Sequence, residues 1–348
     1  MQERTPLSRT TKYTVIVAFI LFSAYNLVLA ALQDYVLFLS NDQSALGISF
    51  GIFALSAVIS RFISGRIIER IDDALALVFG NIILTIALGT YSIALNISVV
   101  YLTRAIQGFG WALSTVTVLT MISENTESAR VSEALGYLNG FGSLSLMLFP
   151  VFGSWIVALK NLESFIMCFQ LAFSISLLSV GFSVYAWKST PTRVEHEKPI
   201  SGLPERMVMI PTLSAIMVFV PLGLLLSYSP EIAALNAIQN PGTFFFVFAF
   251  AQIIGSFIGG VCTGNSHYRW VATIGALFVV CGVMILVIFG GILGYIIAAL
   301  TVGFGLAITN IALNSYVSLV SRESDAKGMA IYSAGVDSAI AGGSFSTA

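Results

Sequence analysis

The sequence predicts an all-α polytopic membrane protein made of two six-helix bundles that repeat in parallel, and three observations support this. First, the 348 residues are 57% hydrophobic and only 9% charged, and the mean hydropathy is +0.92. Soluble domains carry about 25% charged residues and about 45–50% apolar ones. The second observation is a series of long apolar segments, and the third is a match between the two halves of the chain.

The apolar segments are long enough to cross a bilayer. A membrane helix needs about 20 mostly apolar residues to span about 30 Å of hydrocarbon. This length predicts eleven helices, at residues 13–39, 45–64, 74–96, 98–123, 133–159, 163–187, 207–229, 241–262, 269–289, 291–318 and 328–348. The first segment is too long for the core of a signal peptide, so we interpret it as an uncleaved membrane helix.

The basic residues predict the orientation. With a cytoplasmic N-terminus, the predicted inside segments contain every Lys and Arg, Arg61 included, except Arg104 and Lys160. Cytoplasmic loops of membrane proteins carry such an excess of basic residues. We therefore expect a multi-pass protein of the cell (plasma) membrane, surrounded by lipid, with its N-terminus in the cytoplasm.

A polar segment divides the chain into two parts. Residues 188–206 are charged, contain three prolines and form the longest hydrophilic stretch, which predicts a cytoplasmic linker. The domains are then an N-terminal six-helix bundle at residues 1–187 and a C-terminal bundle at residues 207–348, in which five helices are counted.

The two bundles match at one constant offset. Adding 195 to a residue number carries the "GFG" at residues 108–110 onto the "GFG" at residues 303–305, and Tyr137 onto Tyr332. Because six is an even number of crossings, both units enter the membrane from the same side. The repeat is therefore parallel, about an axis along the membrane normal, as in one class of secondary transporters.

The sequence lacks the residues that several classes of function require. His196 and His267 lie in polar connections, and the three cysteines lie in apolar segments, so neither a metal site nor a catalytic triad is expected. No Gly-x-x-x-x-Gly-Lys-Ser/Thr motif for ATP is present. The net charge of -1 with scattered basic residues gives no reason to expect a nucleic-acid partner. We expect no cofactor and no enzymatic activity.

Two stretches follow patterns of a known transporter family. "GRIIERIDD", between the second and third helices, has Gly, three residues, an acid and Arg, in the positions of Gly65, Glu69 and Arg70. The fourth helix contains "RAIQGFG", which has the spacing Arg-x-x-Gln-Gly-x-Gly. Its matching residues are Arg104, Gln107, Gly108 and Gly110.

Both stretches resemble motifs of the major facilitator superfamily. The fifth helix, with Gly140, Pro150 and Gly153, is similar to the antiporter motif of that family's drug–proton exchangers. Departures exist, since Asp72 and Asp73 stand where the loop motif has Gly and a basic run, and Phe149 stands where Gly precedes the proline. The resemblance implies the family fold with twelve helices, so the last one is missing from the count of eleven.

Arg104 is the only charged side chain in residues 74–123. Placing a guanidinium at mid-bilayer costs about 2.5–3.5 kcal/mol on insertion scales. Arg104 either snorkels to the interface or faces a water-filled cavity, where it holds a counter-ion or substrate. The resemblance implies that the first and fourth helices line that cavity, so Asp34 is the expected counter-ion and proton carrier. The alternative for Asp34 is an interfacial carboxylate at a helix end.

Other polar and aromatic side chains within the helices are candidates for the substrate cavity. They are Tyr25, Asn26, Gln107, Trp111, Gln252, Asn310 and Asn314. Hydrogen bonds between helices explain each of them as well as ligand contact does. Asp337 and Glu231 are further candidate acids.

The motif glycines and Pro150 serve helix packing or bending, and the resemblance implies a role in gating. Glu69 caps the N-terminus of the last helix, either in one conformation only or permanently.

We therefore predict a monomeric secondary active transporter that exports a small amphipathic or cationic solute by proton antiport with alternating access. The fifth-helix motif favours export. Proton-coupled uptake of a small metabolite is the alternative within transport, and a truncated, non-transporting membrane protein is the alternative outside it.

Overall fold

The computed structural model describes residues 7–42, 44–68, 70–189, 205–235, 242–264, 267–321 and 325–345. This part of the chain folds into eleven α-helices with two short 3₁₀ turns and contains no strand. The helices are α1 Arg9–Ser40, α2 Ser44–Ile68, α3 Asp73–Thr90, α4 Ile97–Glu124, α5 Val131–Ile156, α6 Leu162–Ser189, α7 Glu205–Leu235, α8 Gly242–Thr263, α9 Tyr268–Ile288, α10 Gly291–Val320 and α11 Asp325–Phe345.

Each predicted helix is present, and the largest differences are that α3 ends earlier than predicted and α7 ends later, at Leu235. Helix α3 stops at Thr90, and a 3₁₀ turn and an extended connection follow, because Asn96 caps α4 by accepting a hydrogen bond from Ser98 N at 2.8 Å. Ten of the described helices are long and apolar enough to cross a membrane. The eleventh, α11, is rich in Ala, Gly and Ser and contains Asp337, which lowers its apolarity.

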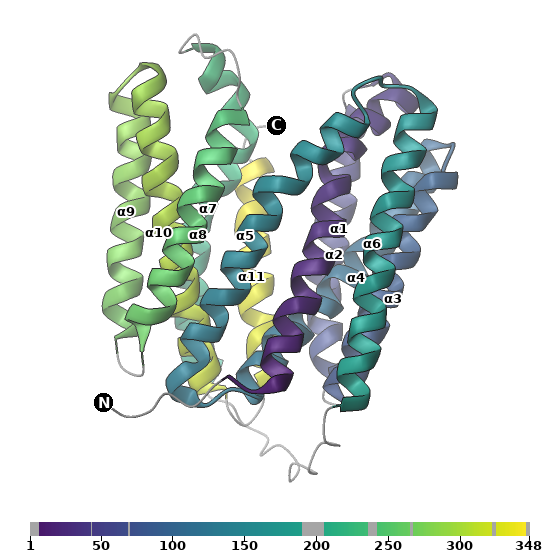
Figure 1. Ribbon diagram of the computed structural model, residues 1–348. Helices are drawn as coiled ribbons and strands as arrows, with labels where there is room; N and C mark the ends of the chain where they lie inside the picture. Colours follow the sequence, from purple (N-terminus) through teal and green to yellow (C-terminus); the bar gives the residue numbers. More distant parts are fainter. Residues whose placement is uncertain are drawn as a thin grey trace.

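The helices are grouped in two halves (Figure 1). Helices α1 to α6 pack on one another, α7 to α11 form the second half, and the two halves meet mainly where α5 packs on α8 and α2 on α11. We call the end where α1 begins and α2 ends the lower face, at the bottom of Figure 1, and the opposite end the upper face. The lower face is the one that the sequence predicts to be cytoplasmic.

Close helix contacts repeat between the halves at the offset of 195. A Cβ on Gly110 would lie 2.7 Å from Leu84 N, and a Cβ on Gly305 would lie 2.8 Å from Val279 N. The hydroxyl of Ser123, in the last turn of α4, contacts that of Ser318 in α10, 195 residues later. A residue that touches its own repeat equivalent lies on the axis relating the two units, so the parallel repeat is confirmed.

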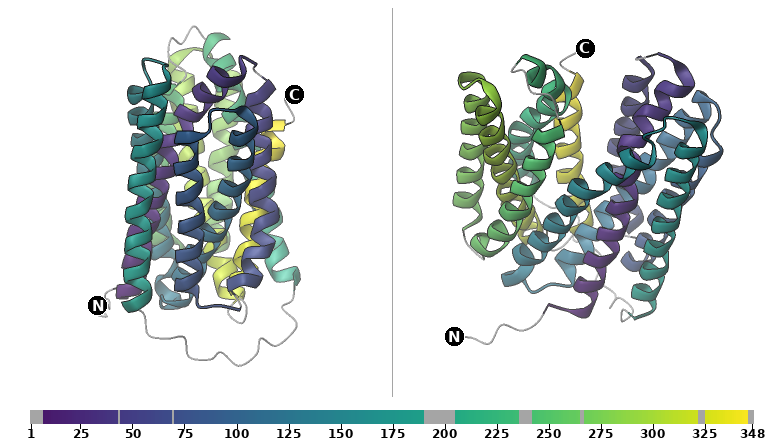
Figure 2. Two further views of the ribbon diagram at one scale, coloured as in Figure 1. Left: turned by 90° about the vertical axis from the view of Figure 1, so that its right-hand side faces the viewer. Right: turned by 45° about the horizontal axis from the view of Figure 1, so that its top comes forward.

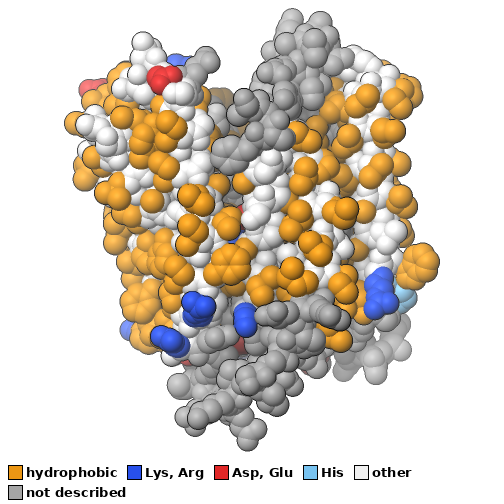
Figure 3. All heavy atoms as spheres, turned by 180° about the vertical axis from the view of Figure 1, so that it is seen from behind, with side chains coloured by type: hydrophobic (Ala, Val, Ile, Leu, Met, Phe, Trp, Pro, Cys, Tyr) orange, Lys and Arg blue, Asp and Glu red, His pale blue; other side chains and the backbone are white. Residues whose placement is uncertain are grey.

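The outer surface is apolar around the middle of the molecule. Large side chains such as Leu177, at 52% exposure in the middle of α6, and Leu277, at 58% in the middle of α9, point outward. Figure 3 shows the molecule from behind, with hydrophobic side chains over its whole height and most of the visible Lys and Arg side chains near the lower rim. Together with the ten apolar helices, this makes the chain a multi-pass membrane protein.

The halves are joined in their lower part and separate toward the upper face. Described polar contacts between them are those of Ser123 with Ser318, Asn139 with Asn310, Arg61 with Asp337 and Ser143 with Gln252. Above these contacts the helices of the two halves diverge toward the upper face (Figure 2).

The glycine contacts give a test of the packing between α2 and α4. A Cβ on Gly108 would lie 2.7 Å from Phe53 O and 2.9 Å from Ser56 Cβ, both on α2. We expect Gly108→Ala to lower stability by about 1–3 kcal/mol, because the backbones must move apart. Heating in detergent followed by size-exclusion chromatography measures the loss.

Gly181→Ala is the matched control, since a Cβ there meets no atom within 4 Å. Equal melting of the Gly108→Ala variant and the unmodified protein would contradict the close approach of α2 and α4.

Candidate functional site

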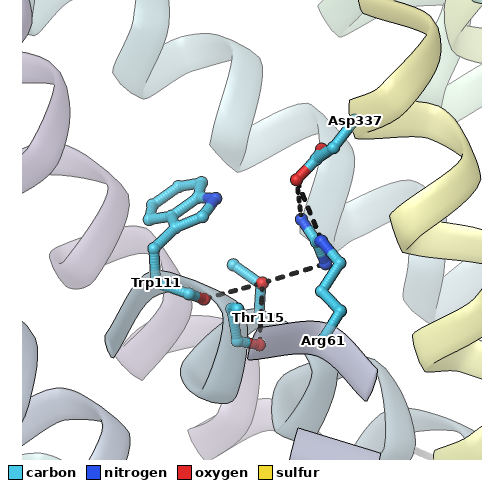
Figure 4. Close-up of polar contacts among 5 residues, drawn as sticks. Arg61, Trp111, Thr115 and Asp337 are labelled. Carbon is cyan, nitrogen blue, oxygen red and sulfur yellow. Dashed lines mark hydrogen bonds and ion pairs between the residues drawn. The ribbon is translucent and has the colours of Figure 1, made fainter. Parts of the chain in front are cut away.

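An ion pair joins the two halves within the helical region. Arg61 on α2 donates from Nε and Nη2 to Oδ2 of Asp337 on α11, at 2.9 and 2.6 Å (Figure 4). The Arg61 side chain is only 5% exposed, whereas that of Asp337 is 27% exposed. The guanidinium therefore depends on this carboxylate, and the carboxylate keeps contact with accessible space.

The first half holds Arg61 in place. Residues at helical spacing on α2, from Ala57 through Ser60 and Ser64, form its buried face, and Arg61 lies on that face. Arg61 Nη1 also donates to Thr115 Oγ1 on α4 at 3.4 Å, and this hydroxyl donates to Trp111 O at 2.8 Å. Arg61 is thus held by the first half of the molecule, and Asp337 on α11 of the second half accepts its remaining hydrogen bonds.

The assignment of Arg61 to the inside segments was wrong. Arg61 lies within α2, seven residues before its end at Ile68, and its charge is neutralised by a carboxylate instead of by water. A signal was available, because Arg61 falls inside the predicted helix 45–64 and Asp337 inside the predicted helix 328–348. An acid and a base in two predicted membrane helices are expected to pair.

Arg104 lies inside the first half and does not snorkel. The residue is 2% exposed. Its Nε donates to the carbonyl and the hydroxyl of Ser49 on α2, at 3.3 and 3.2 Å, and its Nη1 donates to Gln107 Oε1 at 3.0 Å. The rings of Phe50 and Phe53 lie 5.0 and 4.8 Å from its guanidinium carbon. Arg104 is therefore held between α2 and α4.

Asp34 does not reach Arg104 in this conformation. Lys160, in the α5–α6 connection, donates to Asp34 Oδ1 at 3.2 Å, and the two side chains are 68% and 35% exposed. The expected pair is absent from the described contacts because Arg104 turns toward α2, whereas Asp34 lies at the upper end of α1 beside that connection. The coupling roles of both residues remain predictions.

An aromatic cluster lies near both Arg104 and the Arg61–Asp337 ion pair. Tyr25 stacks on Trp111 with ring centroids 4.2 Å apart, and Phe53 lies 5.8 Å from Tyr25. Tyr25 is within electrostatic reach of both Arg104 and Asp337. Both stacked rings are half-buried, so this pair offers an accessible apolar surface between a cation and a carboxylate.

Three further candidates make hydrogen bonds between helices. Gln107 Oε1 accepts from the Tyr91 hydroxyl at 2.7 Å as well as from Arg104. Asn26 Nδ2 donates to Ser145 Oγ at 3.0 Å, joining α1 to α5. Gln252 on α8 accepts from Ser143 on α5 at 3.2 Å, across the junction of the halves.

Asn310 is the centre of a second polar group at this junction. Asn310 Nδ2 donates to Asn139 Oδ1 at 3.1 Å, and its own Oδ1 accepts from Asn314 Nδ2 and from the Tyr332 hydroxyl, both at 3.0 Å. The Oδ1 of Asn314 is buried without a partner among the described residues. Asn139 was missed as a candidate, because nothing in the sequence distinguishes an amide that faces the other half from one within a half.

The motif residues lie mostly at close helix contacts. Gly108 and Gly110 bring α4 against α2 and α3, Gly153 meets the carbonyl of Leu27, and a Cβ on Gly140 would lie 3.0 Å from the Phe257 ring. Of the others, Gly65 is buried in α2, Pro150 lies inside α5 and Arg70 is exposed just after α2. Glu69 and the side chain of Glu231 lie outside the described residues.

The family can be assigned from the sequence as a whole. The model of the family described as Major Facilitator Superfamily matches residues 14–344. The chain belongs to the major facilitator superfamily. It is therefore a membrane transporter and not an enzyme, and the predicted family and fold are confirmed.

Curated relatives in the superfamily are distant. The probable vesicular acetylcholine transporter-B of Danio rerio is 26% identical over 204 residues, which are 55% of this chain and 40% of that protein. The quinolone resistance protein NorA of Staphylococcus aureus is 23% identical over 181 residues, 52% of this chain and 47% of NorA. The matches thus span less than half the length of these relatives.

Solved transporters of the superfamily share the fold. FucP in the outward conformation has a TM-score of 0.79 at 14% identity, covering 94% of this chain and 88% of FucP. The human organic anion transporter MFSD10 (TETRAN) has a TM-score of 0.80 at 12% identity, covering 99% of this chain and 93% of MFSD10.

The ion pair predicts a specific pattern of stability. Removing one partner of a fully buried pair costs about 3–5 kcal/mol. Since Asp337 is 27% exposed, we expect about 1–3 kcal/mol for Arg61→Gln or Asp337→Asn alone. The double variant should recover most of the loss, because it leaves no unpaired charge.

Thermal unfolding of the three variants in detergent measures this coupling. Lys160→Gln, which breaks the exposed pair with Asp34, is the control and should change stability by less than about 1 kcal/mol. Losses that simply add in the double variant would show that the two charges do not stabilise each other.

Proposed function

We propose that this transporter exports a small amphipathic or cationic solute in exchange for protons by alternating access. The observation that carries the proposal is the position of Asp337, a partly exposed carboxylate at the junction of the halves, paired with a buried guanidinium. A proton and a cationic solute would compete for this one carboxylate. Binding of one would then accompany release of the other, which is what antiport requires.

The ion pair would couple binding to the position of the halves. While Asp337 is ionised, its attraction for Arg61 holds α11 against α2. Neutralising Asp337 with a proton leaves the Arg61 guanidinium buried and unpaired, which is unfavourable away from water. Separation of α2 and α11 then becomes favourable, because it admits water to Arg61. An ion pair whose partners belong to different halves suits rocking of the two halves about a fixed site.

The aromatic pair would bind the apolar part of the solute. Tyr25 and Trp111 present stacked, half-buried rings next to the junction. Aromatic faces attract organic cations as well as apolar groups. The names of two relatives agree with this chemistry, since one is a probable transporter of acetylcholine and the other confers resistance to quinolones.

The proposal places the lower face in the cytoplasm of a cell with the transporter in its plasma membrane. Exposed basic residues near that face, such as Arg66 and Arg70, support this orientation. The diverging upper ends of the halves would then face the outside (Figure 2), and one chain contains the whole site, so we propose a monomer.

Proteoliposomes test the exchange. Ethidium serves as a cationic aromatic probe, and a pH-sensitive dye follows protons on the other side of the membrane. We expect a pH gradient to drive ethidium against its concentration gradient, with proton movement in the opposite direction, and an uncoupler to abolish both. Asp337→Asn should reduce this gradient-driven transport to background, because its side chain cannot exchange a proton.

Glu133→Gln is the matched control, since Glu133 is an acid at the lower end of α5 that pairs with Arg130. We expect it to retain gradient-driven transport. Gradient-driven ethidium transport by Asp337→Asn would refute the assigned carboxylate, and movement of both species in the same direction would indicate uptake.

A further inference from the structure

Three bases lie at the lower ends of the two helices that carry the ion pair. Arg66 is in the last turn of α2, Arg70 follows two residues after that helix ends, and Lys327 is in the first turn of α11. All three are exposed, and none of them takes part in a described ion pair or side-chain hydrogen bond. Asp72, the described acid nearest to Arg70 in the sequence, caps α3 by accepting from Leu75 N at 3.2 Å. The three positive charges therefore lack a partner within the described part of the chain.

Closure of the lower junction brings these charges together. Helix α2 belongs to the first half and α11 to the second, and the two helices pack on each other. Counted from the Arg61–Asp337 pair at about 1.5 Å per residue, Arg66 lies about 7–8 Å lower on α2 and Lys327 about 15 Å lower on α11. Like charges repel one another. An anion that contacts both helices at this end would therefore stabilise the closed junction.

The surface directly above these bases is apolar and faces lipid. On α2, Leu55, Ile59 and Phe62 are each more than half exposed, and their helical spacing places them on one face with Arg66. Figure 3 shows the same order on the molecule as a whole, with Lys and Arg side chains along the lower rim below an apolar surface. A molecule with apolar chains above and a negative charge at its lower end matches this surface.

We propose that Arg66, Arg70 and Lys327 form a binding site for the headgroup of an anionic phospholipid, whose acyl chains lie along the exposed face of α2. The phosphate accepts charge-assisted hydrogen bonds from the two guanidinium groups of the first half and from the Lys327 ammonium group of the second. The bound lipid holds the lower ends of α2 and α11 together. If the lower face is cytoplasmic, as proposed above, the site faces the leaflet in which anionic lipids attract basic segments.

Native mass spectrometry of the full chain, freed of lipid in detergent, tests the site. Phosphatidylglycerol and phosphatidylcholine with the same acyl chains are added in turn, because they differ in net charge. Each Lys or Arg near an anionic surface contributes about fivefold in affinity, so the first phosphatidylglycerol should bind at least about tenfold more tightly than phosphatidylcholine. In the variant with Arg66→Gln, Arg70→Gln and Lys327→Gln, the preference should fall to about twofold or less.

A second triple variant separates this site from the general charge of the rim, since basic side chains at a membrane surface also extend to water without binding a particular lipid. Arg9→Gln, Lys12→Gln and Arg269→Gln together remove the same charge from exposed positions at the lower ends of α1 and α9. This variant should keep the preference for phosphatidylglycerol. Equal loss of the preference in both triple variants would refute a site at α2 and α11.

Variants of one half at a time test whether the lipid contacts both halves. Lys327→Gln alone, and Arg66→Gln with Arg70→Gln, should each weaken binding of phosphatidylglycerol. Unchanged affinity of Lys327→Gln would place the lipid on the first half only and would refute the contact between halves.

Thermal unfolding gives a reading that needs no variant. Phosphatidylglycerol should raise the melting temperature of the unmodified protein more than phosphatidylcholine does, and glycerol 3-phosphate, which has no acyl chains, should not raise it. Equal stabilisation by glycerol 3-phosphate and phosphatidylglycerol would show a site for a free anion and overturn the lipid site. None of these measurements uses a proton gradient or a solute, so a failure of the proposed antiport would leave the lipid site in place, and the reverse also holds.

Discussion

The ion pair between Arg61 and Asp337 holds α2 against α11 at a depth where a lone guanidinium would be strongly unfavourable. Its two partners belong to different halves of the molecule, so the relative position of the halves depends on the charge of one side chain. Most other described contacts across the junction are between neutral groups, such as Asn310 with Asn139 and Ser318 with Ser123. These contacts hold the lower part together but do not respond to protons or cations in the same way.

The Arg61–Asp337 pair has no equivalent in the other half of the repeat, although the helix packing around it is symmetric. Backbone contacts at Gly110 and Gly305 are equivalent at the offset of 195. At the same offset, the equivalent of Arg61 is Ser256 and the equivalent of Asp337 is Gly142. The α5–α8 junction accordingly packs through small residues, with a Cβ on Gly136 only 2.7 Å from Ser256 O. One junction is sensitive to charge, and the other serves as a tight neutral contact.

The sequence predicted the helices and the repeat because these depend on properties that lie along the chain. Apolar length determines where a segment crosses, and the spacing of small residues such as Gly108 determines where helices approach. The partners of the charged residues could not be predicted in the same way. Asp34 and Asp337 both lie in membrane helices, and choosing between them as partners of Arg104 or Arg61 requires the rotation of each helix about its axis. Arg61 was misassigned because it lies near a predicted helix end, where a base usually faces water.

The central claim is that the charge of Asp337 controls the junction of α2 and α11. Double electron–electron resonance tests it directly, with spin labels at the exposed positions Arg66 on α2 and Lys327 on α11, in a background without Cys168, Cys262 and Cys281. In nanodiscs, the chain with Asp337 should give one narrow, short distance, and Asp337→Asn should shift part of the population to longer distances. An identical distribution in the two proteins would show that the lower junction closes without the ion pair, and the coupling assigned to it would be refuted.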